Sequence, residues 1–240
     1  MTPLTAIPTD SISWLIGSAA ILIVGGKSFL SYRRYRDELL KYIAWFALVM
    51  GVALAALSVP SFFTLDIGTL RAWVLVGEGF FYGSMIAQAA IMWFLFLRPR
   101  FSAWLVTVPV GIVGLLSWLY SLPGTYVLLT HNFVAFFNPR ISTIVIAALL
   151  IGLLGPVGAY FLRSAPRQTG FKSIFISLAV GLAYLGSGLI GGGFEIVTGQ
   201  VMTPTSIIGF TIFFSVLLIA MIWPRRASAK PPMQLPTASS

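Results

Sequence analysis

Seven apolar runs separated by short charged segments constrain this sequence more than any other feature. A helix needs about 20 apolar residues to cross the ~30 Å hydrocarbon core of a bilayer, because each residue adds ~1.5 Å of rise. The runs therefore predict an all-α polytopic membrane protein, with one seven-transmembrane-helix bundle over residues 1–226. The expected spans are residues 12–32, 42–64, 72–97, 101–121, 141–162, 173–197 and 206–223.

The composition agrees with this class and argues against others. Hydrophobic residues make up 58% of the 240 residues and charged residues 9%, against about 25% charged in soluble domains. A net charge of +9 would favour nucleic acid as the partner of a soluble protein, but here Lys and Arg gather at the ends of the apolar runs. We therefore expect these residues to meet anionic lipid headgroups on the cytoplasmic side, with no nucleic acid as partner.

The basic residues also predict how the chain is oriented, because connectors rich in Lys and Arg stay in the cytoplasm. They gather in the first, third and fifth connectors and after the last run, while the second and fourth connectors carry Arg71 and Arg140 at their ends. The expected cytoplasmic set is Arg33, Arg34, Arg36, Lys41, Arg98, Arg100, Arg163, Arg167, Lys172, Arg225, Arg226 and Lys230. The prediction is an N-terminus outside and a C-terminus inside the cytoplasmic (inner) membrane.

Two segments fall outside the predicted spans. The fourth connector, between Leu122 and Arg140, is apolar but too short and too interrupted for another span. We expect an interfacial helix or a re-entrant segment on the outer face over about residues 124–138. Residues 227–240 are rich in Pro, Ser and Ala and predict a disordered cytoplasmic tail.

A weak internal similarity indicates a repeat. Lys41 and Lys172 each precede an apolar run that opens a pair of helices, and the two pairs close with Arg98-Pro99-Arg100 and Pro224-Arg225-Arg226. This spacing suits a 3+1+3 arrangement of two parallel three-helix units joined by the fourth helix, as occurs in small transporters. Chance similarity between apolar segments is the alternative.

Glu78 is the most informative residue for function. It lies within the third apolar run, where a carboxylate costs roughly 2.5–3.5 kcal/mol to insert and usually faces the bundle interior. Tyr82 and Gln88 follow on the same helix and make it the most polar span. We therefore expect Glu78, Tyr82 and Gln88 to lie on a substrate or ion pathway, the alternative being that Glu78 is a structural acid.

Small residues at four-residue spacing predict close helix packing. Gly79, Gly83 and Ala87 form one such stripe on the third run, and Gly188 with Gly192 forms another on the sixth. Packing within the bundle is the expected role, and the face of a homo-oligomer is the alternative.

The sixth run ends in three successive glycines followed by Phe194 and Glu195. Each glycine weakens a helix by roughly 1 kcal/mol relative to alanine. The helix is therefore expected to break near the outer surface, which adds Glu195 to the pathway candidates. A plain helix end with an interfacial acid is the alternative.

Several chemistries have no basis in the sequence. There is no cysteine and one histidine, His131, so thiolate metal sites and a bis-histidine haem are excluded. Residues 206–223 contain no lysine that could hold retinal, and no clustered carboxylates or nucleotide motif appear. We expect no cofactor, no metal site and no enzymatic activity.

Three functions remain. The leading hypothesis is a small transporter or channel-like protein for a solute or ion. The second is a non-catalytic subunit or anchor of a larger membrane complex, respiratory or redox assemblies included. The third is a membrane sensor without retinal, which would need a partner because no signalling domain is attached.

Overall fold

The computed structural model describes residues 9–129 and 134–191, and these are mostly helical. The first four helices are α1 (Thr9–Tyr35), α2 (Glu38–Ser58), α3 (Ile67–Met92) and α4 (Trp104–Gly124). A hairpin of β1 (Tyr126–Leu129) and β2 (Val134–Phe137) follows, and then α5 (Arg140–Leu149), α6 (Gly155–Ser164) and α7 (Phe171–Gly186). Short 3₁₀ turns, η1 (Val59–Phe62) and η4 (Ala165–Arg167), and π-helical turns, η2 (Trp93–Leu97), η3 (Leu150–Leu154) and η5 (Ser187–Gly191), extend or join them.

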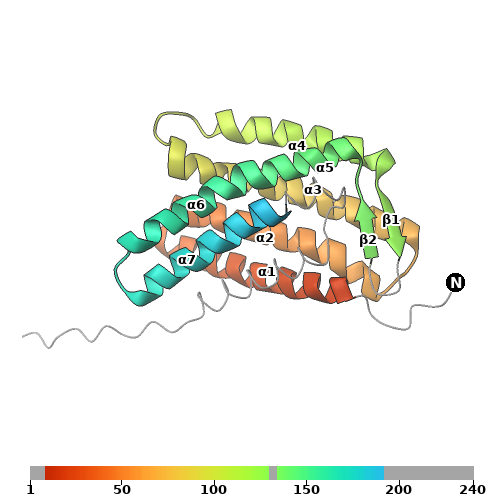
Figure 1. Cartoon of the computed structure of the whole chain (residues 1–240), viewed down its shortest axis with the longest axis horizontal. Helices are drawn as coiled ribbons and strands as arrows, with labels where there is room; N and C mark the ends of the chain where they lie inside the picture. Colours follow the sequence, from red (N-terminus) through yellow and green to blue (C-terminus); the bar gives the residue numbers. More distant parts are fainter. Residues whose placement is uncertain (1–8, 130–133, 192–240) are drawn as a thin grey trace, which may run out of the picture.

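The helices form an up-and-down bundle (Figure 1). α1 packs along α2, α2 along α3 and α3 along α4, while α6 packs along α7. Figure 1 shows α5 and α6 as one long rod that crosses the bundle, with the hairpin at one end. Short connectors make sequence neighbours antiparallel partners, so the first four helices assemble in chain order.

Two aspartates start helices at the ends of connectors. Asp37 caps α2 by accepting a 2.9 Å hydrogen bond from the Leu39 backbone N–H. Asp66 caps α3 and accepts from both the hydroxyl and the backbone N–H of Thr69, each at 2.7 Å. Both hydrogen bonds hold the pKa of Asp66 below its usual value, and the one from the Thr69 hydroxyl has the larger effect. The caps satisfy backbone N–H groups that have no partner within the helix.

The burial pattern of α4 is the reverse of that in a water-soluble helix. Its buried residues are Gly114, Ser117 and Ser121, whereas Trp104 is 74% and Leu116 60% exposed. In water the large apolar side chains would turn inward, but in lipid the small and polar ones do so. Together with the lengths of the helices, this is the pattern of a multi-pass membrane protein.

Within residues 9–129 and 134–191, five helices are long and apolar enough to cross a membrane, and they coincide with the first five predicted spans. They are Ser11–Tyr35, Glu38–Phe62, Ile67–Leu97, Trp104–Gly124 and Arg140–Arg167. The sixth prediction, residues 173–197, overlaps a shorter apolar helix, Ser173–Leu189. The seventh span, the tail and part of the second repeat unit lie outside the described residues, so the seven-helix count and the repeat stay predictions.

Within residues 124–138, the structure contains a hairpin and not the interfacial helix that was one of the two alternatives, and the place of this segment relative to the membrane stays a prediction. β1 and β2 pair antiparallel, with Tyr126 opposite Phe137 and Leu129 opposite Val134. Tyr, Val and Phe suit an extended chain, and the rings of Tyr126 and Phe137 stack at 4.9 Å. A hairpin pairs the backbone N–H and C=O groups of a short segment, and so does a helix. The apolar composition of the segment therefore did not distinguish between the two.

The second half of the bundle contains irregular helix. The π-helical turn η3 lies directly before Pro156, which has no N–H to donate to the preceding turn. η3 also packs on η5, the π-helical turn that extends α7. Beyond η3, α6 and α7 approach so closely that a Cβ on Gly158 would lie 2.6 Å from the Leu185 backbone nitrogen and 2.9 Å from the Gly181 oxygen.

The Gly158 contact predicts a stability difference between two alanine variants. Gly158→Ala should destabilise the protein by about 1–3 kcal/mol, because backbone atoms of α7 would have to move to admit the methyl group. Gly152→Ala is the matched control, since no atom of the described residues lies within 4 Å of its Cβ position. Denaturation by sodium dodecyl sulfate in mixed micelles measures both, and equal stabilities would contradict the close approach of α6 and α7.

Candidate functional site

Glu78 lies on the buried face of α3 and is 4% exposed. Its Oε1 accepts a hydrogen bond from the Asn138 side-chain amide. Its Oε2 is buried and has no hydrogen-bond partner within the part of the chain that the structure describes. One oxygen of this acid is therefore held by Asn138, and the other is enclosed by the protein.

The hairpin of β1 and β2 determines the position of Asn138. Because Tyr126 pairs with Phe137, the residues just outside this pair, Thr125 and Asn138, also come together. The Thr125 hydroxyl donates to Asn138 Oδ1 at 2.8 Å, which orients the amide so that its NH₂ group points to Glu78. Thr125 and Asn138 are 2% and 7% exposed, so the chain of hydrogen bonds is buried.

Further polar side chains extend this group into a buried polar seam, which we define as Glu78, Tyr82, Ser117, Ser121, Thr125, Asn138 and Ser142. The Tyr82 and Ser117 hydroxyls hydrogen-bond at 2.7 Å, and Ser142 donates to the Ser117 carbonyl at 3.2 Å. The Ser121 hydroxyl interacts with the Glu78 carboxyl, but without hydrogen-bond geometry. The seam joins α3, α4 and the start of α5.

Arg71 does not pair with Glu78. Its Nη2 donates to the backbone oxygens of Leu122 at 2.6 Å and Pro123 at 3.3 Å, at the end of α4. The last carbonyls of a helix lack partners within it, and the cation also complements the negative end of the helix dipole. Arg71 therefore stabilises the end of α4 next to the hairpin, and no other basic side chain of the described segments pairs with the Glu78 carboxyl.

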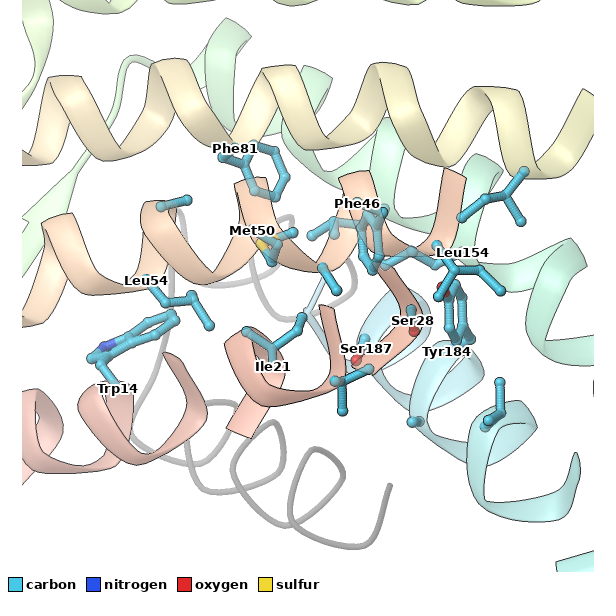
Figure 2. A pocket seen from close by; sticks show the side chains of 18 of the residues that line it. Trp14, Ile21, Ser28, Phe46, Met50, Leu54, Phe81, Leu154, Tyr184 and Ser187 are labelled. Atoms are coloured by element: carbon cyan, nitrogen blue, oxygen red, sulfur yellow. The ribbon is translucent and has the colours of Figure 1, made fainter. Parts of the chain in front are cut away.

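A cavity of about 260 Å³ lies between the helices (Figure 2). Glu78 is among the residues that line it. Its described walls come from α1, α2, α3, β2, α5, η3, α6, α7 and η5. Apolar side chains make up most of them, among them Ile21, Val24, Phe46, Met50, Leu54, Phe81, Phe136 and Leu154. An apolar cavity of this kind excludes water and accepts apolar ligands.

Polar groups line the cavity near its two ends. Figure 2 shows Trp14 and Leu54 at one end and Ser28, Tyr184 and Ser187 at the other. Glu78 belongs to the Trp14 end, because its neighbour Gly77 packs against Leu57 on the same part of α2 as Leu54. The lining residues that carry polar groups thus lie near the two ends, with an apolar stretch between them.

Gln88 is also buried, at 0% exposed, but it lies apart from Glu78. Ten residues separate the two along α3, about 15 Å at 1.5 Å per residue, and Gln88 is not among the described residues that line the cavity. Its side-chain nitrogen donates to the Leu153 carbonyl in η3 at 3.2 Å, and its Oε1 has no partner among the described residues. The structure does not bring Gln88 and Glu78 into one site.

The small-residue positions have different surroundings. A Cβ on Gly79 would lie 3.5 Å from Trp118 of α4 and one on Gly83 3.5 Å from Val49 of α2, which are ordinary contact distances, and Ala87 is buried. Gly188 is closer, since its Cβ would lie 2.9 Å from the Leu150 carbonyl. Gly192, Glu195 and His131 lie outside the described residues.

Sequence reasoning missed Asn138, Thr125 and Ser121. Asn138 stands between two phenylalanines and Pro139 in an apolar segment, and that isolated amide was the signal that could have marked it. Thr125 and Ser121 carried no signal, because single hydroxyls are common in membrane helices. Across residues 9–129 and 134–191, no three His, Asp or Glu side chains gather in a way that could hold a metal ion.

No protein-family model matches the chain, and no curated protein matches it. The function therefore has to be argued from the cavity and the buried polar seam.

The Glu78–Asn138 hydrogen bond predicts energetic coupling between the two residues. In a double-mutant cycle of Glu78→Gln and Asn138→Ala, we expect a coupling of about 0.6–1.7 kcal/mol, the range for interhelical hydrogen bonds in membrane proteins. Unfolding in mixed micelles measures it. Glu78→Gln combined with Gln88→Leu is the control pair, and its effects should add within about 0.5 kcal/mol because the residues do not touch. A Glu78–Asn138 coupling no larger than that of the control pair would contradict the assignment.

Proposed function

We propose that this chain is a small multi-pass membrane transporter that binds its solute in the cavity beside Glu78. One observation carries the proposal: Glu78, a buried acid of α3, is among the residues that line an apolar cavity of about 260 Å³. A carboxyl inside a membrane bundle is costly to insert and commonly marks a substrate pathway.

The cavity favours a lipid-soluble solute over an ion. Moving a charge into an apolar environment without compensating ligands is strongly unfavourable, and the described walls offer few polar atoms to replace the water around an ion. Ion channels instead line their pathways with rings of carbonyl or charged groups. The proposed function is therefore transport of a lipid-soluble solute and not conduction of an ion.

Two π-helical turns next to the cavity support the proposal that the helices around it can move. Leu150 and Leu154 of η3 and Ser187 of η5 contribute to its walls, and both segments are π-helical turns. Such turns occur frequently at functional sites, because the irregular backbone can rearrange at low cost. We propose that α6 and α7 shift relative to α1–α3 when the cavity opens.

The proposed topology has seven spans, with the N-terminus outside and the C-terminus in the cytoplasm, in the inner membrane. The alternation of basic connectors supports it, and the Glu38–Arg98 ion pair, at 2.9 Å, joins the start of α2 to the end of η2 on the expected cytoplasmic side.

Because the chain contains no cysteine, single introduced cysteines test this topology. Phe63→Cys, at a position 84% exposed, should react with an impermeant maleimide added to intact cells. Ser102→Cys, at an exposed position in the next connector, should react only after the cells are opened. The reverse labelling pattern would overturn the orientation.

Transport itself is tested without assuming a solute. Cells lacking the chain are supplied with the wild type, Glu78→Gln or the lipid-facing control Leu116→Phe, and the compounds in cells, membranes and medium are compared by untargeted mass spectrometry. We expect at least one compound to change its distribution with the wild type and the control, and to revert by about tenfold or more with Glu78→Gln. Unchanged distributions in all strains would contradict transport.

The exposed face of α4 favours a second candidate, a non-catalytic subunit of a larger membrane complex. Trp104, Leu105 and Leu116 are each at least 60% exposed, and α4 buries little of its surface within the chain. Such a face suits lipid or a partner helix equally. Native mass spectrometry after gentle extraction separates the candidates: stoichiometric partner chains would favour the subunit, and the chain travelling alone or as a symmetric oligomer would favour the transporter.

A further inference from the structure

We propose that Gln88 is a latch that holds the wall of the cavity closed. Its side-chain amide ties α3 to the π-helical turn η3, and release of this bond lets α6 and α7 move away from α1 and α2. The latch assigns a residue to the proposed movement of the helices and rests on the proposed function only for what enters when the cavity opens. Three features support it: the hydrogen bond of Gln88, the place of η3 in the chain and the walls of the cavity.

Gln88 is fully buried and reaches from α3 to a distant helix. Its Nε2 donates to the Leu153 backbone oxygen at 3.2 Å, across 65 positions of the chain. Its Oε1 is also buried and has no partner among the described residues, so one end of the amide carries the interaction. A single hydrogen bond between membrane helices shifts an equilibrium by about three- to twentyfold. Such a bond is strong enough to favour one arrangement and weak enough to be released.

Leu153 lies in η3, at the point where the rod of α5 and α6 loses its support from α4. Before η3, α5 packs on α4, and the Ser142 hydroxyl donates to the Ser117 carbonyl. After η3, α6 packs mainly along α7. Pro156 follows directly and has no N–H to donate to the preceding turn. Bending of the rod is therefore easiest at η3, where Gln88 holds it.

The Gln88 bond lies beside the cavity wall. Leu150 and Leu154 of η3 line the cavity, and so does Ile91, which lies about one turn beyond Gln88 on α3. η3 is also packed tightly on η5, because a Cβ on Gly188 would lie 2.9 Å from the Leu150 carbonyl oxygen. A shift of η3 would therefore carry η5 and α7 with it and change the width of the cavity.

α7 faces α1 and α2 across the cavity through apolar surfaces. Ala183 and Tyr184 of α7 line one side, while Ile21 of α1 and Phe46 of α2 line the other. Figure 2 shows Phe46 and Tyr184 near each other, and their rings are 5.9 Å apart. Apolar surfaces in a bilayer are not driven together by water, because lipid tails solvate them as well. The directional bond from Gln88 therefore biases these helices toward the closed arrangement.

Reaction of a buried cysteine measures the opening, because the chain contains no cysteine of its own. Ala183→Cys, at a cavity position that is 3% exposed, reports on opening of the cavity. Ala56→Cys, at a position that is 6% exposed and not among the described lining residues, reports on unfolding of the bundle. The full chain in lipid nanodiscs is treated with methyl methanethiosulfonate, a small thiol reagent, and the reaction rates are followed by mass spectrometry.

Gln88→Met keeps the length of the side chain but cannot donate. It should raise the reaction rate of Ala183→Cys by about three- to twentyfold and leave that of Ala56→Cys unchanged. Gln88→Asn keeps the amide but is one carbon–carbon bond shorter, so it should have the same effect, and it serves as the test if Gln88→Met does not fold. Ser84→Ala is the matched control, because this buried hydroxyl on α3 donates to the Phe81 carbonyl of its own helix. It should change neither rate.

Two results would overturn the latch. Equal acceleration of Ala183→Cys and Ala56→Cys would mean that Gln88 only stabilises the bundle, and unchanged rates in both Gln88 variants would mean that its bond does not hold the wall. The outcome is separable from the transport test. Selective acceleration of Ala183→Cys without any change in compound distribution would leave the latch standing and remove transport, whereas transport by a protein whose rates are insensitive to Gln88 would do the opposite.

Discussion

The absence of water inside a bilayer means that each polar group within the hydrocarbon core has to find its partner in the protein. In this chain that constraint determines how α3, α4 and α5 meet. α4 presents lipid with large apolar side chains and turns Ser117 and Ser121 inward, where they join the seam around Glu78. At the end of the same helix, Arg71 supplies the hydrogen bonds that the last carbonyls of α4 lack.

The hairpin connects this seam to the candidate site. Its register brings Thr125 beside Asn138, and Thr125 turns the Asn138 amide toward Glu78. One Glu78 oxygen is thereby hydrogen-bonded within the protein, while the other is enclosed and has no hydrogen-bond partner among the described residues. Glu78 is also among the residues that line the apolar cavity, so the seam and the cavity meet at this residue.

The rest of the cavity depends on how closely the backbones approach. Gly158 and Gly181 let α6 and α7 pack backbone to backbone, and the π-helical turns η3 and η5 bring Leu154 and Ser187 to the cavity wall. The small-residue stripe of α3 predicted close helix packing, yet Gly79 and Gly83 face two different helices at ordinary contact distances. Four-residue spacing identified a surface of small residues but not the helices that would use it.

The sequence alone determined the class of protein, the first five membrane-crossing helices and the importance of Glu78, because length, hydropathy and the cost of a buried carboxylate are local properties. It could not distinguish a hairpin from an interfacial helix at residues 124–138, since both satisfy the backbone of a short apolar segment. That Glu78 and Gln88 lie on one pathway stays a prediction. Only the tertiary structure paired Glu78 with Asn138 from 60 residues away, brought Gln88 to the Leu153 carbonyl and formed the cavity, because these features depend on which helices become neighbours.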